Sequence, residues 1–215
     1  MGEDIRPNRN RRILLFLGLT LILLTGGYFV AVPVWRRQWI PNNEREASDA
    51  LKVLVSAEAS FRAGDLDRNG VADYWTGDVA GLSKFGLIPR PLAEADFEPL
   101  VPLAPKPIPY NGYYFKALRM DKGETPPVAY RQDTDKTSGK VHHLTKFGFV
   151  AWPAEQGVTG SRMYIVNENN TIFPRRELSK LFPKEVWPTI KPQPDLSEPP
   201  DYWPPDEELV WYSKE

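Results

Sequence analysis

The sequence contains no cysteine and only two histidines. The absence of cysteine excludes disulfides, thiolate metal sites and cysteine nucleophiles. The histidines, His142 and His143, are adjacent, and adjacent residues of a strand point to opposite faces. We therefore do not expect these side chains to share a metal ion or to form a catalytic pair. An exported domain without disulfides has to be stabilised by its core or by a metal.

The signatures of several enzyme classes are also missing. The chain has no P-loop, no dinucleotide-binding fingerprint, no G-x-S-x-G and no H-E-x-x-H. Its formal net charge of −1 does not indicate a basic surface for nucleic acid. Its paired carboxylates lie in turn-forming loops rather than on apolar strands that would raise their pKa values. We expect no catalytic residues, no nucleotide and no nucleic-acid partner.

One long stretch, residues 13–32, carries no charge. As a helix, about 20 residues rising ~1.5 Å each span about 30 Å, the hydrocarbon thickness of a bilayer. Arginines precede it within residues 1–12, and an aromatic and basic collar follows it, formed by Trp35, Arg36, Arg37 and Trp39. The pattern predicts an uncleaved transmembrane signal anchor at 13–32 that binds the lipid bilayer.

The orientation of this anchor follows from its charges. More arginines precede the apolar run than follow it closely, which favours a cytoplasmic head at 1–12. The main domain is then expected in the periplasm, held at the inner membrane. A cleaved signal peptide is the alternative, with Thr25-Gly26-Gly27 as its small-residue site.

An amphipathic helix is expected after the anchor. Pro33 and Pro41 are expected to interrupt any continuous helix, so residues 33–42 are predicted to be a juxtamembrane linker. A new helix is predicted from Asn43, an N-cap type, with Glu46 completing a capping box, and it should end at Gly64. Its apolar positions recur at three- and four-residue steps: Ala47, Ala50, Leu51, Leu54, Ala57 (or Glu58) and Phe61.

An acidic loop, residues 65–73, follows this helix and fits D-x-D-x-N-G-x-x-D. Calcium loops place oxygen ligands at alternate positions around such a turn, with a glycine at its sharpest point. The predicted ligands are the side chains of Asp65, Asp67, Asn69 and Asp73 and the carbonyl of Val71. Thr76 stands at the twelfth position, where an EF-hand has a bidentate glutamate. Alternatively, Asn69-Gly70 forms a simple turn whose aspartates cap backbone N–H groups.

The rest of the chain indicates short strands joined by proline-rich connections. Aromatic and β-branched runs predict strands at 113–119, 147–152, 163–166 and 171–173, the last two forming a hairpin. Residues 183–215 are proline-rich and are expected to be an irregular tail. The predicted fold is α+β, an amphipathic helix packed on a small antiparallel sheet in a domain spanning 43–182.

Two resemblances follow from these residues. The first rests on Gly112-Tyr113-Tyr114, Ala151-Trp152-Pro153, Gly157, Gly160 and Ile165-Val166-Asn167. In their order over residues 47–173, they resemble an uncharacterised bacterial exported family, the domain of unknown function 2950 type, which implies no known activity. The layout is also similar to type IV pilins and pseudopilins. It departs from a prepilin because Arg12, not glycine, precedes the apolar run and no glutamate occurs near Phe16.

These observations lead to a functional expectation. The protein is predicted to be a membrane-anchored extracytoplasmic structural or interaction protein of the bacterial envelope, with a pilin-like layout and no catalysis. Its expected partners are proteins of an envelope or secretion-type assembly. The alternative is a calcium-dependent surface binding module that uses residues 65–73. A small envelope hydrolase is the third.

Overall fold

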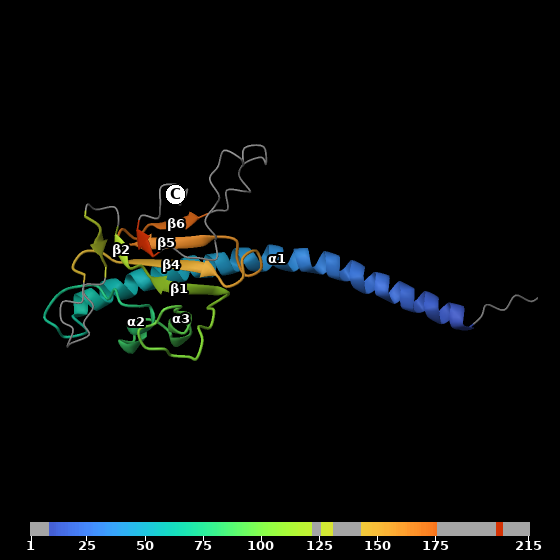
Figure 1. Ribbon diagram of the computed structural model, residues 1–215, viewed down its shortest axis with the longest axis horizontal. Helices are drawn as coiled ribbons and strands as arrows, with labels where there is room; N and C mark the ends of the chain where they lie inside the picture. The colour runs from blue at the N-terminus through green and yellow to red at the C-terminus, as the bar shows by residue number, and fades with distance from the viewer. Residues whose placement is uncertain (1–8, 122–125, 131–142, 176–200, 204–215) are drawn as a thin grey trace, which may run out of the picture. The chain divides into compact units, whose positions relative to one another are not determined.

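The computed structural model describes residues 9–121, 126–130, 143–175 and 201–203 (Figure 1). The chain has two units, Met1–Trp39 and Ile40–Glu215. In the part of the chain that the structure describes, no helix is both long and apolar enough to cross a membrane. The anchor at 13–32 therefore stays a prediction.

Helix α1 runs without a break from Arg9–Gly64, over 56 residues. The prediction that Pro33 and Pro41 interrupt it, and that a new helix begins at Asn43, is wrong. A proline inside a helix removes one hydrogen bond and kinks the helix, at a cost of about 3 kcal/mol, without having to end it. Beyond Pro41, contacts to a distant loop offset part of this cost. The Asn43 Nδ2 donates to the Thr159 carbonyl at 2.8 Å instead of capping a helix.

Glu44 makes the second of these contacts. Its Oε1 accepts hydrogen bonds from the backbone N–H and the hydroxyl of Ser161, at 3.1 and 2.6 Å. Its Oε2 lies 3.4 Å from the guanidinium of Arg162. Asn43 and Glu44 thus fasten the connection between two strands to the helix.

The apolar face predicted for the helix is confirmed. Every member of it is at most 4% exposed: Ala47, Ala50, Leu51, Leu54, Ala57 and Phe61. Asp49 and Lys52 on the other face are exposed, as expected from the spacing. The helix ends at Gly64 as predicted, but Gly64 is still helical, and the positive φ expected of a residue just past the helix is found at Asp65 instead.

This face packs against a four-stranded antiparallel sheet of order β1-β4-β5-β6, which lies along the same part of α1 in Figure 1. The strands are β1 Tyr113–Ala117, β4 Gly148–Pro153, β5 Met163–Asn167 and β6 Ile172–Arg175. All four strand predictions are confirmed to within about two residues. In the register, Phe115 pairs with Ala151 and Val150 pairs with Ile165. The α+β class is therefore correct.

Alternation along the strands divides the core into two clusters. Phe115, Phe149 and Tyr164 belong to the cluster that includes the helix face. Val150 and Ile165 belong to a second cluster on the opposite face, with Leu118 and Tyr130. Both faces of the central strands are buried, which explains why β4 and β5 contain so few polar residues.

Five short elements complete the fold. Helices α2 Ala80–Lys84 and α3 Arg90–Ala93 contribute buried residues to the helix-face cluster. A second sheet of order β3-β2-β7 joins β2 Met120–Asp121, β3 Val128–Ala129 and β7 Tyr202–Trp203. The expectation that the tail is irregular is therefore wrong at Tyr202–Trp203, where it adds a strand. The rest of 183–215 lies outside the described residues.

Candidate functional site

The acidic loop begins where α1 ends. Three of its residues have positive φ, Asp65 at 42°, Arg68 at 57° and Gly70 at 79°, so the backbone turns sharply there. The Asp65 carboxylate closes the turn by accepting the backbone N–H groups of Asn69 and Gly70, both at 3.0 Å. Asp65 thus has the backbone-capping role that was the alternative to a metal ligand.

The side-chain amide of Asn69 joins the remaining acids of the loop. Its Nδ2 donates to Asp67 Oδ2 at 2.8 Å and to Asp73 Oδ2 at 3.3 Å. Its Oδ1 accepts the N–H of Val71 at 2.6 Å, and the Val71 carbonyl accepts the N–H of Asp73 at 3.1 Å. Asp67, Asn69 and Asp73 therefore converge. The atom between the two carboxylates is the amide nitrogen, where a calcium site needs the amide oxygen.

The structure does not decide the calcium prediction. Over the described residues, no group of three or more His, Asp or Glu side chains is placed to hold a metal ion. A 180° turn of the Asn69 amide would present its oxygen to the space between Asp67 and Asp73. Calcium at Asp65, Asp67, Asn69, Val71 and Asp73 stays a prediction.

A buried glutamate lies beside the end of the loop. Glu58 of α1 is 0% exposed, and neither of its carboxylate oxygens makes a hydrogen bond that meets normal geometry. Burial raises the pKa of Glu58 well above its ordinary value, the backbone of Trp75 lowers it, and the neighbouring Asp73 carboxylate raises it further. Asp73 is itself only 1% exposed. Two carboxylates thus approach each other out of contact with water.

Sequence reasoning placed Glu58 only as an occupant of the apolar face. The signal was present, because Glu58 lies on the Leu54–Phe61 side of the helix, four residues after Leu54 and three before Phe61. A charged residue in such a stripe is expected to be paired, to bind a metal or to be protonated. No hydrogen bond to its oxygens meets normal geometry, and the nearby Trp75 backbone does not offset the effect of burial, so Glu58 is expected to be protonated or to bind a cation.

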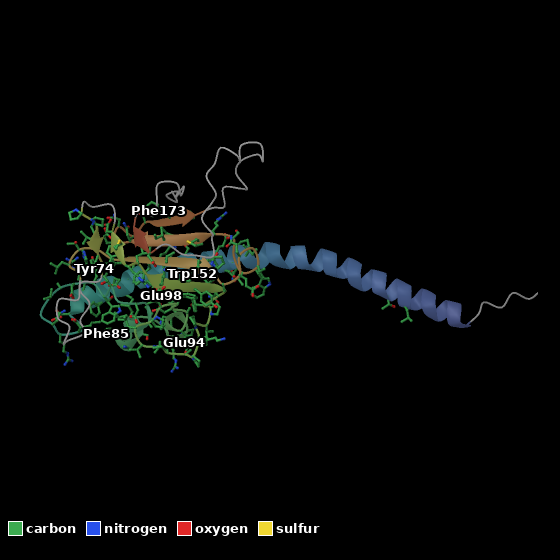
Figure 2. The ribbon with its side chains drawn as sticks, viewed as in Figure 1. Tyr74, Phe85, Glu94, Glu98, Trp152 and Phe173 are labelled. Carbon is green, nitrogen blue, oxygen red and sulfur yellow. The ribbon has the colours of Figure 1, made fainter. Side chains whose placement is uncertain are left out.

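Aromatic rings make the surroundings of Glu58 apolar. Phe61 meets Trp75 and Phe85 edge-to-face, with ring centroids 5.8 and 5.1 Å apart. Tyr74, labelled with Phe85 in Figure 2, packs on Phe147 at 4.9 Å, and the Arg62 guanidinium lies 4.9 Å from its ring. These rings fix the exit of the acidic loop to the core.

His143 supports the backbone near this site. It is 6% exposed, and its Nδ1 accepts the N–H groups of Thr145 and Lys146, at 3.3 and 2.9 Å. Its carbonyl accepts the N–H of Tyr74 at 2.9 Å. Because Nδ1 is an acceptor in this arrangement, the ring is the neutral tautomer with its proton on Nε2. His142 lies outside the described residues.

Two further buried carboxylates hold the segment after the loop. Asp96 Oδ2 accepts the N–H groups of Val79 and Ala80, each at 2.8 Å, at the start of α2. Asp78 Oδ1 accepts the N–H of Gly81 at 2.8 Å. Burial raises the pKa of Asp96 to about 7, although its backbone hydrogen bonds act in the opposite direction. Capping of α2 explains both residues without a ligand.

Comparison with known proteins gives one match. A family model described as a protein of unknown function (DUF2950) matches residues 33–186. No curated protein and no solved structure matches the chain significantly. The match includes the second half of α1, the acidic loop and the four-stranded sheet.

Proposed function

The chain belongs to the DUF2950 family, whose function is unknown, and we propose that it is a membrane-anchored, extracytoplasmic structural or interaction protein. In this proposal, residues 13–32 are the anchor, residues 1–12 lie in the cytoplasm and the sheet-bearing domain lies outside the inner membrane. The layout is pilin-like, with one N-terminal helix that contains an apolar run and, further along, the face that packs on an antiparallel sheet. Its partners are proteins of the envelope.

The observation that carries the proposal is that α1 contains both an uncharged run and the residues that form the core. The uncharged residues 13–32 and the core-forming residues 47–61 lie on one helix, with no non-helical residue between them. A run of about 20 uncharged residues matches the hydrocarbon thickness of a bilayer. Such a run is hard to place in water, because its exposed apolar surface would cause aggregation.

Cysteine labelling tests this proposal, because the natural chain has no cysteine. Ala59 is exposed on α1, so Ala59→Cys introduces a thiol on the domain surface. The matched control is Asn8→Cys, in the predicted cytoplasmic head. In spheroplasts, a membrane-impermeant maleimide is expected to label the first variant and not the second.

A second candidate, a calcium-dependent binding module, is favoured by Glu58. The acidic loop lacks the acidic ligand expected at its twelfth position, and Glu58 supplies a carboxylate without a hydrogen-bond partner next to Asp73. A divalent cation held by the ligands predicted in residues 65–73, with Glu58 added, would neutralise the buried charge and satisfy its oxygens. Binding would require Glu58 to lose its proton and the Asn69 amide to turn over. Because the described carboxylates are not placed around a common metal position, binding would also require them to move together.

A melting experiment with calcium tests this candidate. Sites on extracellular modules bind calcium with a Kd of about 0.1–1 mM, so 10 mM calcium would stabilise the folded state by about 1.4–2.7 kcal/mol. For a unit of this size, that corresponds to a rise in Tm of roughly 3–10 °C. Asp67→Asn is expected to abolish the rise, while Asp49→Asn, an exposed control on α1, should retain it. An equal rise with magnesium, or no rise in the natural chain, would exclude the site.

A further inference from the structure

The proline-rich tail returns to the domain as strand β7. Met120 of β2 pairs in parallel with Tyr202 of β7, and Asp121 pairs with Trp203. Just before this pairing, the Arg119 N–H donates to the Asp201 carbonyl at 2.7 Å. Three consecutive residues of the tail are thus held against the end of the β1–β2 segment.

Lys116 is the main side-chain contact of this tail segment. Its side chain is only 6% exposed, and its ammonium contacts the Asp201 carboxylate directly, with Glu98 further away at 3.9 Å. The guanidinium of Arg119 lies 2.6 Å from Glu98, which is labelled in Figure 2. We call Glu98, Lys116 and Arg119 the Lys116 clamp.

The charges of the clamp require an anion. Without Asp201, its two cations share the single carboxylate of Glu98, and that carboxylate is engaged mainly by Arg119. Lys116 is buried with Asp201 in place, so loss of Asp201 removes its closest carboxylate and also opens the ammonium to water. The Asp201 carboxylate balances the positive charge of the clamp, and its backbone carbonyl accepts a hydrogen bond from the Arg119 N–H. Side-chain charge and backbone pairing together recognise an acidic residue followed by a parallel strand.

An open cleft continues from the clamp. It has a volume of about 460 Å³ and is lined in part by Glu98, Leu100 and Arg119. Leu100 is 40% exposed and its neighbour Val101 is 52% exposed. Glu98 and Arg119 of the clamp thus also line a cleft whose walls are part polar and part apolar, so there is room beside the clamp for further peptide contacts.

The covalent link between tail and domain is long. Residues 176–200 separate β6 from Asp201, so this segment has 25 residues, six of them proline. Fully extended, it reaches at most about 80–90 Å. The pairing itself involves two-residue strands only, and such short pairings open at low free-energy cost. The tail can therefore leave its own clamp and reach that of a neighbouring molecule.

We propose that the clamp links copies of this chain, with residues 201–203 of one copy bound in the Lys116 clamp of another. Exchange of identical segments makes the same contacts in both arrangements, so it costs little beyond the entropy of association. The inference rests on the proposed function, since anchoring in one membrane would concentrate copies beside each other. It names the partner of the interaction domain as a second copy.

Cysteine cross-linking tests the exchange. Met120→Cys and Tyr202→Cys place thiols at paired Cα positions of β2 and β7, and neither single variant can close a disulfide within one chain. Full-length chains of the two variants, of different tag lengths, are mixed in detergent and oxidised mildly. The expected result is a mixed covalent dimer. Its yield should be at least several-fold higher than the yield from a control mixture of Met120→Cys and Ala59→Cys chains. Adding Asp201→Asn to the Tyr202→Cys chain should reduce it to that control level.

Two results would overturn the proposal. One is a disulfide that forms in the double variant, within a single chain, while the mixed single variants stay monomeric. The other is a mixed dimer no more abundant than the Ala59→Cys control. Because the measurement uses purified chains in detergent, it does not depend on which side of a membrane the domain occupies.

Reversing the charges of Lys116 and Asp201 in separate variants tests the same proposal without cysteines. Lys116→Glu and Asp201→Lys each place like charges in a chain's own clamp. Only in a mixture of the two variants does each clamp meet an opposite charge on the other chain. A larger species in the mixture, absent from either variant alone, is expected by size-exclusion chromatography with light scattering. A mixture that elutes as the sum of its components would contradict the proposal.

Discussion

Replacing Glu58 by methionine is expected to raise the free energy of unfolding at pH 8 by about 1–3 kcal/mol. In the natural chain, the folded state must bury a carboxyl group whose oxygens make no hydrogen bond of normal geometry. Methionine has a similar length, no charge and enough flexibility to fill the same space beside Phe61 and Trp75. Glu58→Gln should raise the free energy of unfolding by less, because it removes the charge but leaves a buried polar group.

The same substitution should alter the pH dependence of stability. The pKa of Glu58 is raised in the folded state, so from about pH 4.5 upward the folded chain holds a proton that the unfolded chain has lost. Stability from this group is therefore complete below the unfolded pKa and is lost as the pH rises through the folded pKa. Asp96 contributes in the same direction, with a window from about 4 to about 7.

Urea midpoints of the full chain in detergent, measured from pH 5 to pH 9, check both expectations. The natural chain should lose stability as the pH rises, and Glu58→Met and Glu58→Gln should lose less. Glu46→Gln is the control, since Glu46 lies on the same helix with its side chain 37% exposed. If Glu58→Met were less stable than the natural chain at pH 8, Glu58 would have to be bound by a partner or cation.

The second large effect is expected at Phe61. Phe61→Ala should cost about 3–5 kcal/mol, the range for a buried aromatic residue replaced by alanine. Its side chain is 0% exposed and contacts the rings of both Trp75 and Phe85. Removing it leaves a cavity at the point where α1 ends and the acidic loop begins. The loop should lose order together with the core.

Val53→Ala provides the comparison, because Val53 is on the same helix and 41% exposed. It should change stability by no more than about 0.5 kcal/mol. Denaturant unfolding can be followed by tryptophan fluorescence, to which Trp75 contributes as one of seven tryptophans. If Phe61→Ala prevents folding, Phe61→Leu should give a smaller and measurable loss in the same direction. Equal losses for Phe61→Ala and Val53→Ala would show that the helix does not pack as described.

Local patterns predicted the parts of the fold that depend on periodicity. The three- and four-residue steps of α1 identified its buried face, and aromatic runs located the four strands of the main sheet. Both signals work because burial on one side of an element constrains nearby residues. Gly70 was placed correctly because a sharp turn leaves a local signature, whereas the positive φ expected at Gly64 falls on Asp65.

Contacts between distant residues explain what could not be predicted. Pro41 was predicted to be a helix boundary because the free-energy cost of a proline inside a helix can be recognised from the local sequence. The hydrogen bond from Asn43 to Thr159, 116 residues away, cannot be recognised in this way. Likewise, Lys116 and Asp201 are 85 residues apart, so nothing near either residue indicates a strand at Tyr202–Trp203. In the site, the acidic motif was recognised, but the unpaired state of Glu58 depends on a core that forms only in three dimensions.

Labelling of Ala59→Cys shows whether the domain lies outside the membrane that residues 13–32 are proposed to cross. Spheroplasts carrying this variant are treated with an impermeant maleimide before and after lysis, and the chain is recovered from the membrane pellet. The expected result is that Ala59→Cys is labelled equally in both samples, while Asn8→Cys is labelled only after lysis. Protection of Ala59→Cys until lysis, or recovery of the chain in the soluble fraction, would contradict it.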